Sequence, residues 1–285
     1  MSRIMIEWRS KGTSVVLKPQ RNIKIVACGD LHVPFHDPTA ILLCLKIIKM
    51  VKPHVFILAG DVVDFYAVSK YLRNPQRRLM LGDEIKQATE VIKRFYDAAP
   101  NALHIFLAGN HEQRLKNYLY SVAPELSSLP QLSLQELLGL KKWIVLEHQD
   151  FPQSIEGDRY PLVTFEGNHL TIRHGDGLRL TSSAINIARC VFLRTLSNTI
   201  VFHFHHLSVF VQKDYFGKVK GCWSIPCLAL PRPAYEAGKI YDQGFVVIEY
   251  FTDGSFRVIP VLFFHEDGHL FCHFEGKKIT QKKEG

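Results

Sequence analysis

The chain has 285 residues, of which 47% are hydrophobic and 22% charged, so it can bury one large core or two modest ones. It contains no apolar run of roughly 18 residues and no apolar stretch at its start, so we expect no membrane span, no secretory leader and a cytoplasmic location. The formal net charge of +8 favours anionic partners, namely phosphates or nucleic acid.

Strands and helices are predicted to alternate in the first half of the chain. Residues 23–28, 55–59 and 103–108 are apolar or β-branched runs typical of strands, and residues 40–51 and 84–98 have helical spacing. This alternation indicates a largely parallel sheet, where ligands bind beyond the carboxyl ends of the strands.

Polar residues follow all three of these strands. Each cluster alone is a weak signal, because short motifs are frequent and two of the three also suit a capped helix start. Their joint occurrence at three successive strand ends indicates one site where carboxylate, amide and imidazole groups converge. In chain order the clusters are Asp30-x-His32, Gly60-Asp61-x-x-Asp64 and Gly109-Asn110-His111-Glu112.

The second half of the chain is predicted to be richer in antiparallel strands, after a helical middle at roughly 112–140. Turn residues separate several apolar runs there, as hairpin connections do. The predicted strands are 162–165, 170–173, 199–202 and 244–248, and the predicted hairpin turns are 166–169, 252–254 and 266–268. We therefore expect an α/β fold with two mixed sheets.

One domain over residues 1–285 is the simplest organisation, because no linker rich in Pro, Gly or Ser divides the chain. Residues 1–22 precede the first predicted strand and are assigned as an N-terminal extension. Residues 277–285 form a lysine-rich tail, which we expect to be frayed.

Two histidine clusters follow strands of the second half. His174-Gly175-Asp176 comes after residues 170–173, and His203-Phe204-His205-His206 comes after residues 199–201. Alternate residues of extended backbone point to the same side, so His203 and His205 would face the site while His206 faces away. By the same reasoning Asp30 and His32 would act together.

Taken in order, the five clusters resemble the motifs of the calcineurin-like metallophosphoesterase superfamily, from about residue 23 to residue 210. The resemblance implies a four-layer sandwich of two mixed β-sheets flanked by helices. It also implies hydrolysis of phosphate monoesters or diesters through in-line attack by a hydroxide that bridges two divalent ions. Oxygen and imidazole ligands suit Mn, Fe or Zn.

The resemblance also assigns roles to individual residues. His111 would contact phosphate and protonate the leaving oxygen, with Asp64 orienting its ring. Asn110 and Arg114 would bind substrate, although an exposed arginine on a helix is an equal alternative for Arg114. The implied metal ligands are Asp30, His32, Asp61 and His205 for one ion, and Asp61, Asn110, His174 and His203 for the other.

One position departs from the superfamily pattern, because Phe202 stands where a glycine usually precedes the last His-x-His pair. Glycine permits backbone conformations that phenylalanine resists. Either His205 or His206 could therefore complete the site. Residues 134–140 and 242–247 further resemble a subset found in bacteriophages and prophages.

Three functions remain open from the sequence. The leading one is a metal-dependent phosphatase or phosphodiesterase that acts on a phosphorylated substrate. A DNA or RNA nuclease at the same site is slightly favoured by the net charge. The basic residues Lys70, Arg73, Arg77 and Arg78 could steer a polyanion, although a solvated helix face is an equal alternative. The third is a non-catalytic module that binds phosphate or nucleic acid through a degenerate site.

Overall fold

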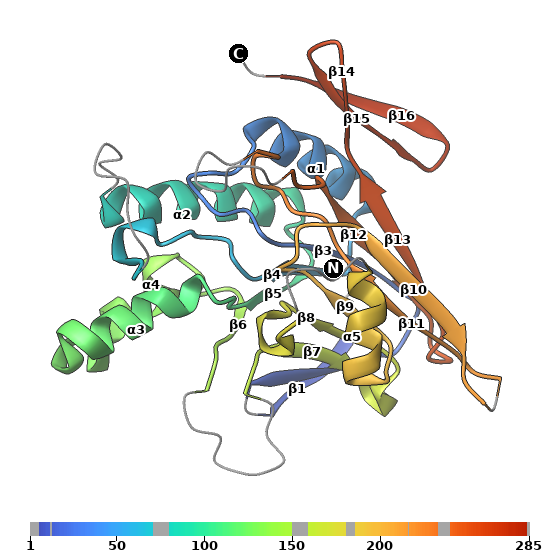
Figure 1. The fold of residues 1–285 in the computed structure, drawn as a ribbon, viewed down its shortest axis with the longest axis horizontal. Helices are drawn as coiled ribbons and strands as arrows, with labels where there is room; N and C mark the ends of the chain where they lie inside the picture. Colours follow the sequence, from blue (N-terminus) through green and yellow to red (C-terminus); the bar gives the residue numbers. More distant parts are fainter. Residues whose placement is uncertain are drawn as a thin grey trace.

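A computed structural model of the chain describes residues 6–11, 13–70, 80–149, 159–180, 186–215, 217–232 and 240–283. Two β-sheets lie face to face, helices cover both outer faces, and a small third sheet projects at one end (Figure 1). No helix in these ranges is both long enough and apolar enough to cross a membrane.

The six-stranded sheet has the order β13-β12-β3-β4-β5-β6. Strands β3 to β6 are parallel, and β12 pairs antiparallel with both β3 and β13. The strands are β3 (Ile23–Cys28), β4 (Val55–Ala59), β5 (Leu103–Leu107), β6 (Ile144–Leu146), β12 (Gly244–Tyr250) and β13 (Phe256–Leu262). The predicted strands of the first half are therefore confirmed, with β3 and β4 at the predicted bounds.

Helices connect these parallel strands and cover the outer face of the sheet. In α1, Asp37 caps the first turn by accepting hydrogen bonds from the N–H groups of Thr39 and Ala40, and Lys52 closes the helix in a left-handed conformation. The helices of this part are α1 (Pro38–Val51), α2 (Leu81–Ala98), α3 (Glu112–Val122) and α4 (Leu134–Leu137), with 3₁₀ turns at Tyr66–Val68, Pro124–Ser128 and Pro130–Leu132.

The predicted helical middle is interrupted. Helix α3 ends at Val122, directly before Pro124, and 3₁₀ turns begin at Pro124 and Pro130. Proline cannot donate the next helical hydrogen bond and disfavours helical geometry in the residue before it. These two prolines therefore divide the segment.

The seven-stranded sheet has the order β1-β2-β7-β8-β9-β11-β10. It is less antiparallel than expected, because β9 runs parallel to both β8 and β11, and β2 runs parallel to β7. Its elements are β1 (Ile6–Lys11), β2 (Ser14–Pro19), β7 (Leu162–Phe165), β8 (Thr171–Arg173), β9 (Thr199–Val201), β10 (Ser208–Lys213) and β11 (Val219–Ser224), with 3₁₀ turns at Glu166–Asn168 and Asp176–Leu178 and helix α5 (Ile187–Thr195).

The cores of the molecule establish the four layers. Alternate residues of β3, β4, β5 and β12 pack inward against the seven-stranded sheet, and the residues between them pack outward against α1 and α2. Helix α5 packs on the far side of the seven-stranded sheet. The predicted sandwich of two mixed sheets between helices is confirmed.

Residues 14–19 and 277–282 form strands, although their composition suggested less order. In the segment assigned as an N-terminal extension, Val15 and Leu17 of β2 are fully buried between the sheets. The lysine-rich tail is not frayed: Lys277–Lys282 forms β16, paired with β15 (His269–Phe274), which also pairs with β14 (Phe264–Glu266). Buried side chains of β15 pack against α1 and hold this small sheet in place.

Candidate metal centre

A cluster of acidic, amide and imidazole side chains lies where strands of both large sheets end. Loops after β3, β4 and β5 supply one part, and loops after β8 and β9 supply the other. The sequence placed these residues at strand ends, and the structure brings all of them together: Asp30, His32, Asp61, Asp64, Asn110, His111, Arg114, His174, His203 and His205.

Five of these residues adopt the left-handed backbone region. Their φ angles are 52° for Asp30, 52° for His32, 50° for Asp61, 71° for His203 and 60° for His205. The extended backbone assumed from the sequence is therefore wrong, although the expected pairs still converge. Residues other than glycine are uncommon in this region, and such strain concentrates at functional sites at a cost of about 1–3 kcal/mol each.

Asp30, His32 and His205 form the first donor group, with one ligand atom of each within 4.8 Å of the others. The Nε2 atoms of His32 and His205 are 3.2 Å apart, and His205 Nε2 is 3.3 Å from Asp30 Oδ1. Asp30 Oδ1 is buried without a hydrogen bond from any described residue. These donors converge on one small space.

Asp61, His174 and His203 form a second group of the same kind. His174 Nε2 lies 3.3 Å from Asp61 Oδ2 and 3.2 Å from Asn110 Oδ1. The other ring nitrogen of His174 is 2.9 Å from the carbonyl oxygen of Ala59, which fixes the ring if Nδ1 carries the proton. Asn110 is therefore placed to add its oxygen to this group.

The donor set fits divalent transition cations. His203 Nδ1, like Asp30 Oδ1, is buried and has no hydrogen bond within the described part of the chain. A buried polar atom without a hydrogen bond is costly, and a bound cation would supply the missing partner. Mixed oxygen and imidazole donors suit Mn, Fe or Zn. A third group, His32, Asp61 and His111, overlaps the other two.

The geometry around Phe202 separates His205 from His206. Phe202 is fully buried, and its N–H donates to the carbonyl oxygen of His174 at 2.8 Å. The residues with left-handed backbone in this loop are His203 and His205. Phe202 has no positive φ angle, so it needs no glycine-like conformation. His206 is 43% exposed and pairs with Asp242 at 3.5 Å. The structure thus brings His205, and not His206, into the cluster.

His111, Asp64 and Arg114 form a connected group beside the cluster. His111 Nδ1 is 3.3 Å from Asp64 Oδ2, and Arg114 Nη1 is 3.0 Å from Asp64 Oδ1. Arg114 Nη2 donates to His111 Nε2 at 2.8 Å when that nitrogen is unprotonated. Arg114 is therefore not an exposed helix arginine, because its side chain is only 19% exposed and held at the site.

The electrostatics of this group favour a charged pair in the metal-free protein. Burial opposes the charge on His111, but the Asp61 and Asp64 carboxylates raise the pKa of His111 above its ordinary value. Burial likewise opposes the charge on Asp64, yet hydrogen bonds with His111 and His32 hold its pKa well below the usual range. Asp64 is therefore held as a carboxylate, which can orient the ring of His111.

Glu112 has a structural role that the sequence did not reveal. Its buried carboxylate accepts four backbone N–H bonds: from Asp61 and Gly109 to Oε2, at 2.9 and 2.8 Å, and from Val62 and Val63 to Oε1, at 2.8 and 3.0 Å. Burial, followed by the Asp61 carboxylate, raises the pKa of Glu112. It ties together the loops after β4 and β5.

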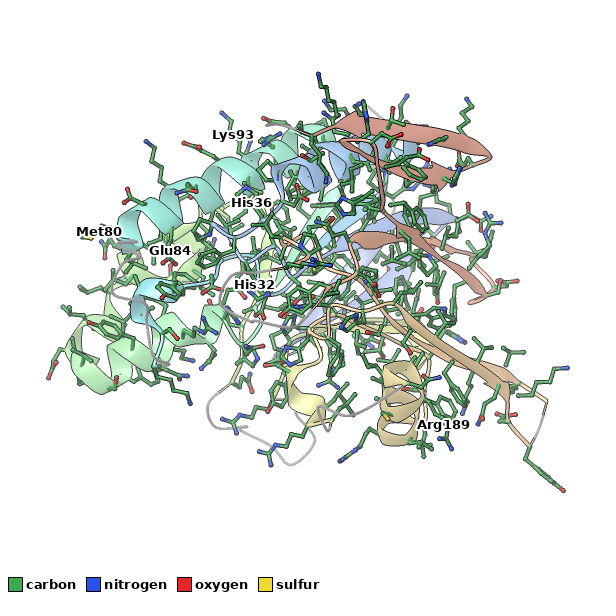
Figure 2. All side chains as sticks on the ribbon, turned by 45° about the horizontal axis from the view of Figure 1, so that its top comes forward. His32, His36, Met80, Glu84, Lys93 and Arg189 are labelled. Atoms are coloured by element: carbon green, nitrogen blue, oxygen red, sulfur yellow. The ribbon has the colours of Figure 1, made fainter. Side chains whose placement is uncertain are left out.

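Glu84 holds the 3₁₀ turn at Tyr66–Val68, in the segment that follows β4. Its two carboxylate oxygens accept hydrogen bonds from the N–H groups of Tyr66 and Ala67, both at 2.9 Å. Burial, helped by the nearby Asp64 charge, raises the pKa of Glu84 to about 7. Figure 2 shows Glu84 on α2 and His32 nearer the middle of the molecule. A second buried carboxylate thus supports the site from outside.

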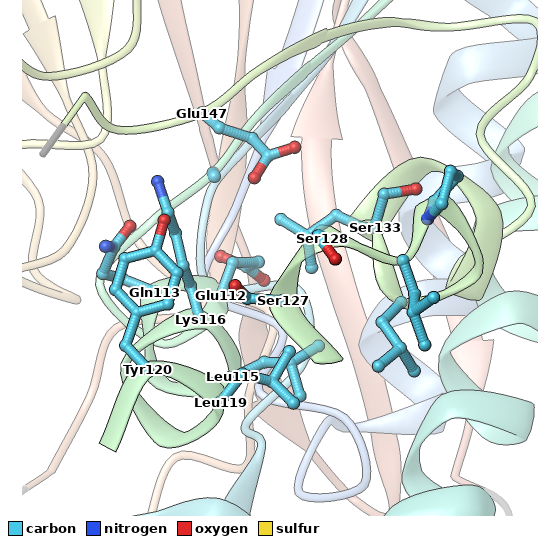
Figure 3. A pocket seen from close by; sticks show the side chains of 15 residues that line it. Glu112, Gln113, Leu115, Lys116, Leu119, Tyr120, Ser127, Ser128, Ser133 and Glu147 are labelled. Atoms are coloured by element: carbon cyan, nitrogen blue, oxygen red, sulfur yellow. The ribbon is translucent and has the colours of Figure 1, made fainter. Parts of the chain in front are cut away.

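Two pockets border α3. The smaller, about 210 Å³, lies between α3 and the following 3₁₀ turns, where Lys116 and Tyr120 face Ser127 and Ser128 (Figure 3). The larger, about 800 Å³, is a groove that starts at Asn110, Arg114 and Asp176 beside the donor cluster. Lys70 also lines the groove. The other basic residues noted in the sequence, Arg73, Arg77 and Arg78, lie outside the described residues.

Comparison with known proteins decides the family. The model of the calcineurin-like phosphoesterases matches residues 23–220, which contain every residue of the donor cluster. The chain belongs to the calcineurin-like phosphoesterase family. Membership of this family supports metal-dependent hydrolysis of phosphate esters as the general reaction.

Two phage proteins are similar to this calcineurin-like phosphoesterase. The Gene 54 protein of Mycobacterium phage L5 is 24% identical over 211 residues, which cover 71% of this chain and 77% of that protein. The Gene 54 protein of Mycobacterium phage D29 is 24% identical over 268 residues, covering 87% and 98%. Both come from bacteriophages, as the resemblance of residues 134–140 and 242–247 indicated.

Several solved structures are distantly similar to the chain. Vacuolar protein sorting 29 from Cryptosporidium parvum has 14% identity and a TM-score of 0.40, with 92% of this chain and 96% of that chain covered. YfcE, a phosphoesterase from E. coli, has 12% identity and a TM-score of 0.35, with coverages of 83% and 98%. A dimetal phosphatase from Danio rerio has 11% identity and a TM-score of 0.37, with coverages of 92% and 99%.

Proposed function

We propose that this chain hydrolyses phosphate monoesters or diesters with two divalent cations. The observation that carries the proposal is the arrangement of two donor groups around Asp61, all buried except the partly exposed His203. Asp61 Oδ2 is 3.3 Å from His174 Nε2, a member of one group, and 3.9 Å from His32 Nε2, a member of the other. A shared carboxylate helps to hold two cations that repel each other.

The proposed ligands of each cation follow from these groups. One cation would take Asp30, His32, Asp61 and His205, and the other would take Asp61, Asn110, His174 and His203. When bound, two such cations neutralise phosphoryl oxygens and activate water for in-line attack on phosphorus. Mn, Fe and Zn are the expected ions because the donors are oxygen and imidazole nitrogen.

The remaining polar residues would bind substrate and move a proton. His111 faces the cluster with Nε2 3.7 Å from Asp61 Oδ2, while Asp64 holds its other ring nitrogen. His111 would give a proton from Nε2 to the leaving oxygen. Arg114, which contacts this nitrogen at 2.8 Å, would turn its guanidinium to the phosphate oxygens.

Hydrolysis of two small model substrates tests the proposal. We expect Mn²⁺-dependent hydrolysis of p-nitrophenyl phosphate or bis-p-nitrophenyl phosphate, which EDTA abolishes and Mn²⁺ restores. The ratio of the two rates gives the preference for monoesters or diesters. A protein that binds two ions and hydrolyses neither substrate nor any nucleic acid would instead be the non-catalytic module.

His111→Ala gives the first mutational prediction. Loss of general acid help should lower kcat about 10²–10⁴-fold while both ions stay bound, because His111 is not among the proposed ligands. Mn²⁺ content by metal analysis and kcat on bis-p-nitrophenyl phosphate would be measured together. His206→Ala is the matched control and should keep near-normal kcat. Normal turnover in a metal-loaded His111→Ala protein would rule out its role as the acid.

A further inference from the structure

The large groove beside the donor cluster is continuous with the proposed catalytic site. Its inner end adjoins the donor cluster through Asn110 and Arg114, and Asp176, Lys70, Arg159 and Tyr160 also line it. Its volume of about 800 Å³ is at the upper end of the range for ligand pockets. A phosphoryl group held at the donor cluster would fill only its inner end, so the groove has room for the groups attached to that phosphate.

The charge of the groove favours a polyanion. Three of its described lining residues, Lys70, Arg114 and Arg159, are basic, and Lys70 and Arg159 are exposed. Asp176 is the single carboxylate among the described lining residues, and His148 pairs with it at 2.9 Å. The charges of Lys70 and Arg159, in addition to that of Arg114, would therefore attract further phosphates of the substrate, apart from the phosphate at the metal centre.

One face of α3 lines the groove without an acidic residue. Gln113, Arg114, Asn117, Tyr118 and Ser121 line this wall, at spacings that lie on one side of a helix. Tyr118 is 42% exposed. Amide groups that can pair with base edges, together with aromatic rings, are the features with which proteins bind unpaired bases.

The groove is also lined by a polar pair, His148 and Asp176, that offers further recognition. His148 is 7% exposed and lines the groove, its Nε2 is held by Asp176, and its ring lies 5.4 Å from the ring of Tyr160. His148 Nδ1 has no hydrogen bond from the described residues. A buried polar atom without a protein partner indicates a site for a bound group or a water.

We propose that this groove binds single-stranded nucleic acid next to a phosphodiester at the metal centre, with Lys70 and Arg159 on flanking phosphates and Tyr118 and Tyr160 against bases. The inference rests on the proposed function and names its substrate class. DNA and RNA strands share the phosphate charge and the unpaired bases, so both are tested. Such a strand explains why the basic residues extend past the reacting phosphate.

The variant Lys70→Ala/Arg159→Ala tests the groove without altering the proposed metal ligands, His111 or Arg114. Binding of fluorescein-labelled oligo-dT and oligo-U to the full chain in EDTA would be measured by anisotropy at several salt concentrations. We expect the variant to bind about tenfold more weakly at low salt. The slope of log K against log salt should become shallower by about 0.7 for each phosphate that the variant no longer neutralises.

The matched control is Lys277→Ala/Lys282→Ala. It removes the same charge from exposed positions of β16, on the small sheet at the opposite end of the molecule from α3 (Figure 1). This control should bind oligonucleotides as the unaltered protein does. Equal weakening in both variants would mean that net charge alone drives binding, and the proposed groove would be rejected.

Turnover separates this inference from the proposed function. The groove variant should hydrolyse bis-p-nitrophenyl phosphate within about twofold of normal, because that substrate has no flanking phosphates for Lys70 and Arg159 to bind, while kcat/KM on a labelled single strand falls about tenfold. Hydrolysis of the small diester without cleavage of either strand would overturn the groove assignment alone. Equal cleavage of duplex and single strand, or strand cleavage unaffected by the variant, would also overturn it.

Discussion

The two sheets contribute to the metal centre in different ways. The loops after β4 and β5 are tied by Glu112, a carboxylate that is 1% exposed and accepts four backbone N–H bonds. The loop after β9 is held by several separate bonds. The Asp242 carboxylate, which is 46% exposed, accepts from Leu207 N–H at 2.9 Å, and the Asp242 N–H and the Ser224 hydroxyl donate to the carbonyl oxygens of His205 and His206 at 3.0 and 2.8 Å. One buried carboxylate thus ties the half of the site on the six-stranded sheet, whereas separate bonds, one of them to a half-exposed carboxylate, hold the other half.

The half supplied by the seven-stranded sheet takes its position partly from the first half. His174 Nδ1 lies 2.9 Å from the Ala59 carbonyl oxygen, and His203 N–H donates to Asp30 Oδ2 at 2.8 Å. Both partners belong to loops or strands of the six-stranded sheet. Damage to the first half should therefore spread to the second, whereas damage to the second should remain local.

Glu112→Gln should produce the largest loss. The amide can still accept from one pair of N–H groups, but its NH₂ would face the other pair, and each unsatisfied buried donor costs about 1–3 kcal/mol. We expect the free energy of unfolding to fall by about 2–6 kcal/mol. Urea unfolding of the metal-free protein measures this change.

Asp242→Asn is the matched control for that comparison, since it makes the same chemical change at a half-exposed carboxylate that holds the loop after β9. We expect it to cost less than about 1 kcal/mol, because water can replace the lost interactions. If the two variants lose equal stability, the proposed difference between the half-sites is wrong.

The next effect is a pH-dependent difference in the free energy of unfolding between the unaltered protein and Glu84→Gln. The folded protein raises the pKa of Glu84 from 4.5 to about 7, so the folded state binds the proton more tightly than the unfolded state. Glu84 therefore contributes stability below pH 4.5 that is lost as the pH rises through about 7, by at most about 3 kcal/mol.

The measurement is the difference in unfolding free energy between the unaltered protein and Glu84→Gln in EDTA, from pH 4.5 to 7.5. The unaltered protein should lose stability relative to the variant across this window, because glutamine does not titrate. A parallel pH profile for the two proteins would show that Glu84 does not titrate in this range.

His205→Ala should weaken binding of one cation by at least about tenfold while leaving the fold intact, because its loop is held locally. His206→Ala should bind both ions normally, since its side chain points to Asp242. Mn²⁺ titration by calorimetry compares the two. Weaker binding in His206→Ala than in His205→Ala would reverse the assignment.

Much of the first half-site could be predicted because its signals are local. Strands β3 and β4 are apolar runs that end directly before Gly-Asp pairs, and parallel strands end at one edge of a sheet. The positions of Asp30, Asp61 and Asn110 follow from that rule. The histidines of the second half also follow predicted strands, and the resemblance to the family then assigned them to the two cations.

Other features depended on contacts between distant residues. Glu112 bonds to N–H groups of residues 61–63, about fifty positions earlier, and nothing in its own surroundings indicates this. The left-handed backbone at His203 and His205 could not be predicted, because neither position is a glycine, the residue that usually indicates this conformation. Residues 277–282 form a strand that their lysine-rich composition does not indicate. This strand pairs with β15, and β15 packs on α1.

The central claim is that Asp61 joins two cation sites. Metal analysis of the full chain after equilibrium dialysis against Mn²⁺ tests it most directly, with Asp61→Asn measured alongside. We predict two ions per chain in the unaltered protein and fewer than one in Asp61→Asn, because the variant weakens both sites. One ion or none in the unaltered protein, or two ions retained by Asp61→Asn, would contradict this account.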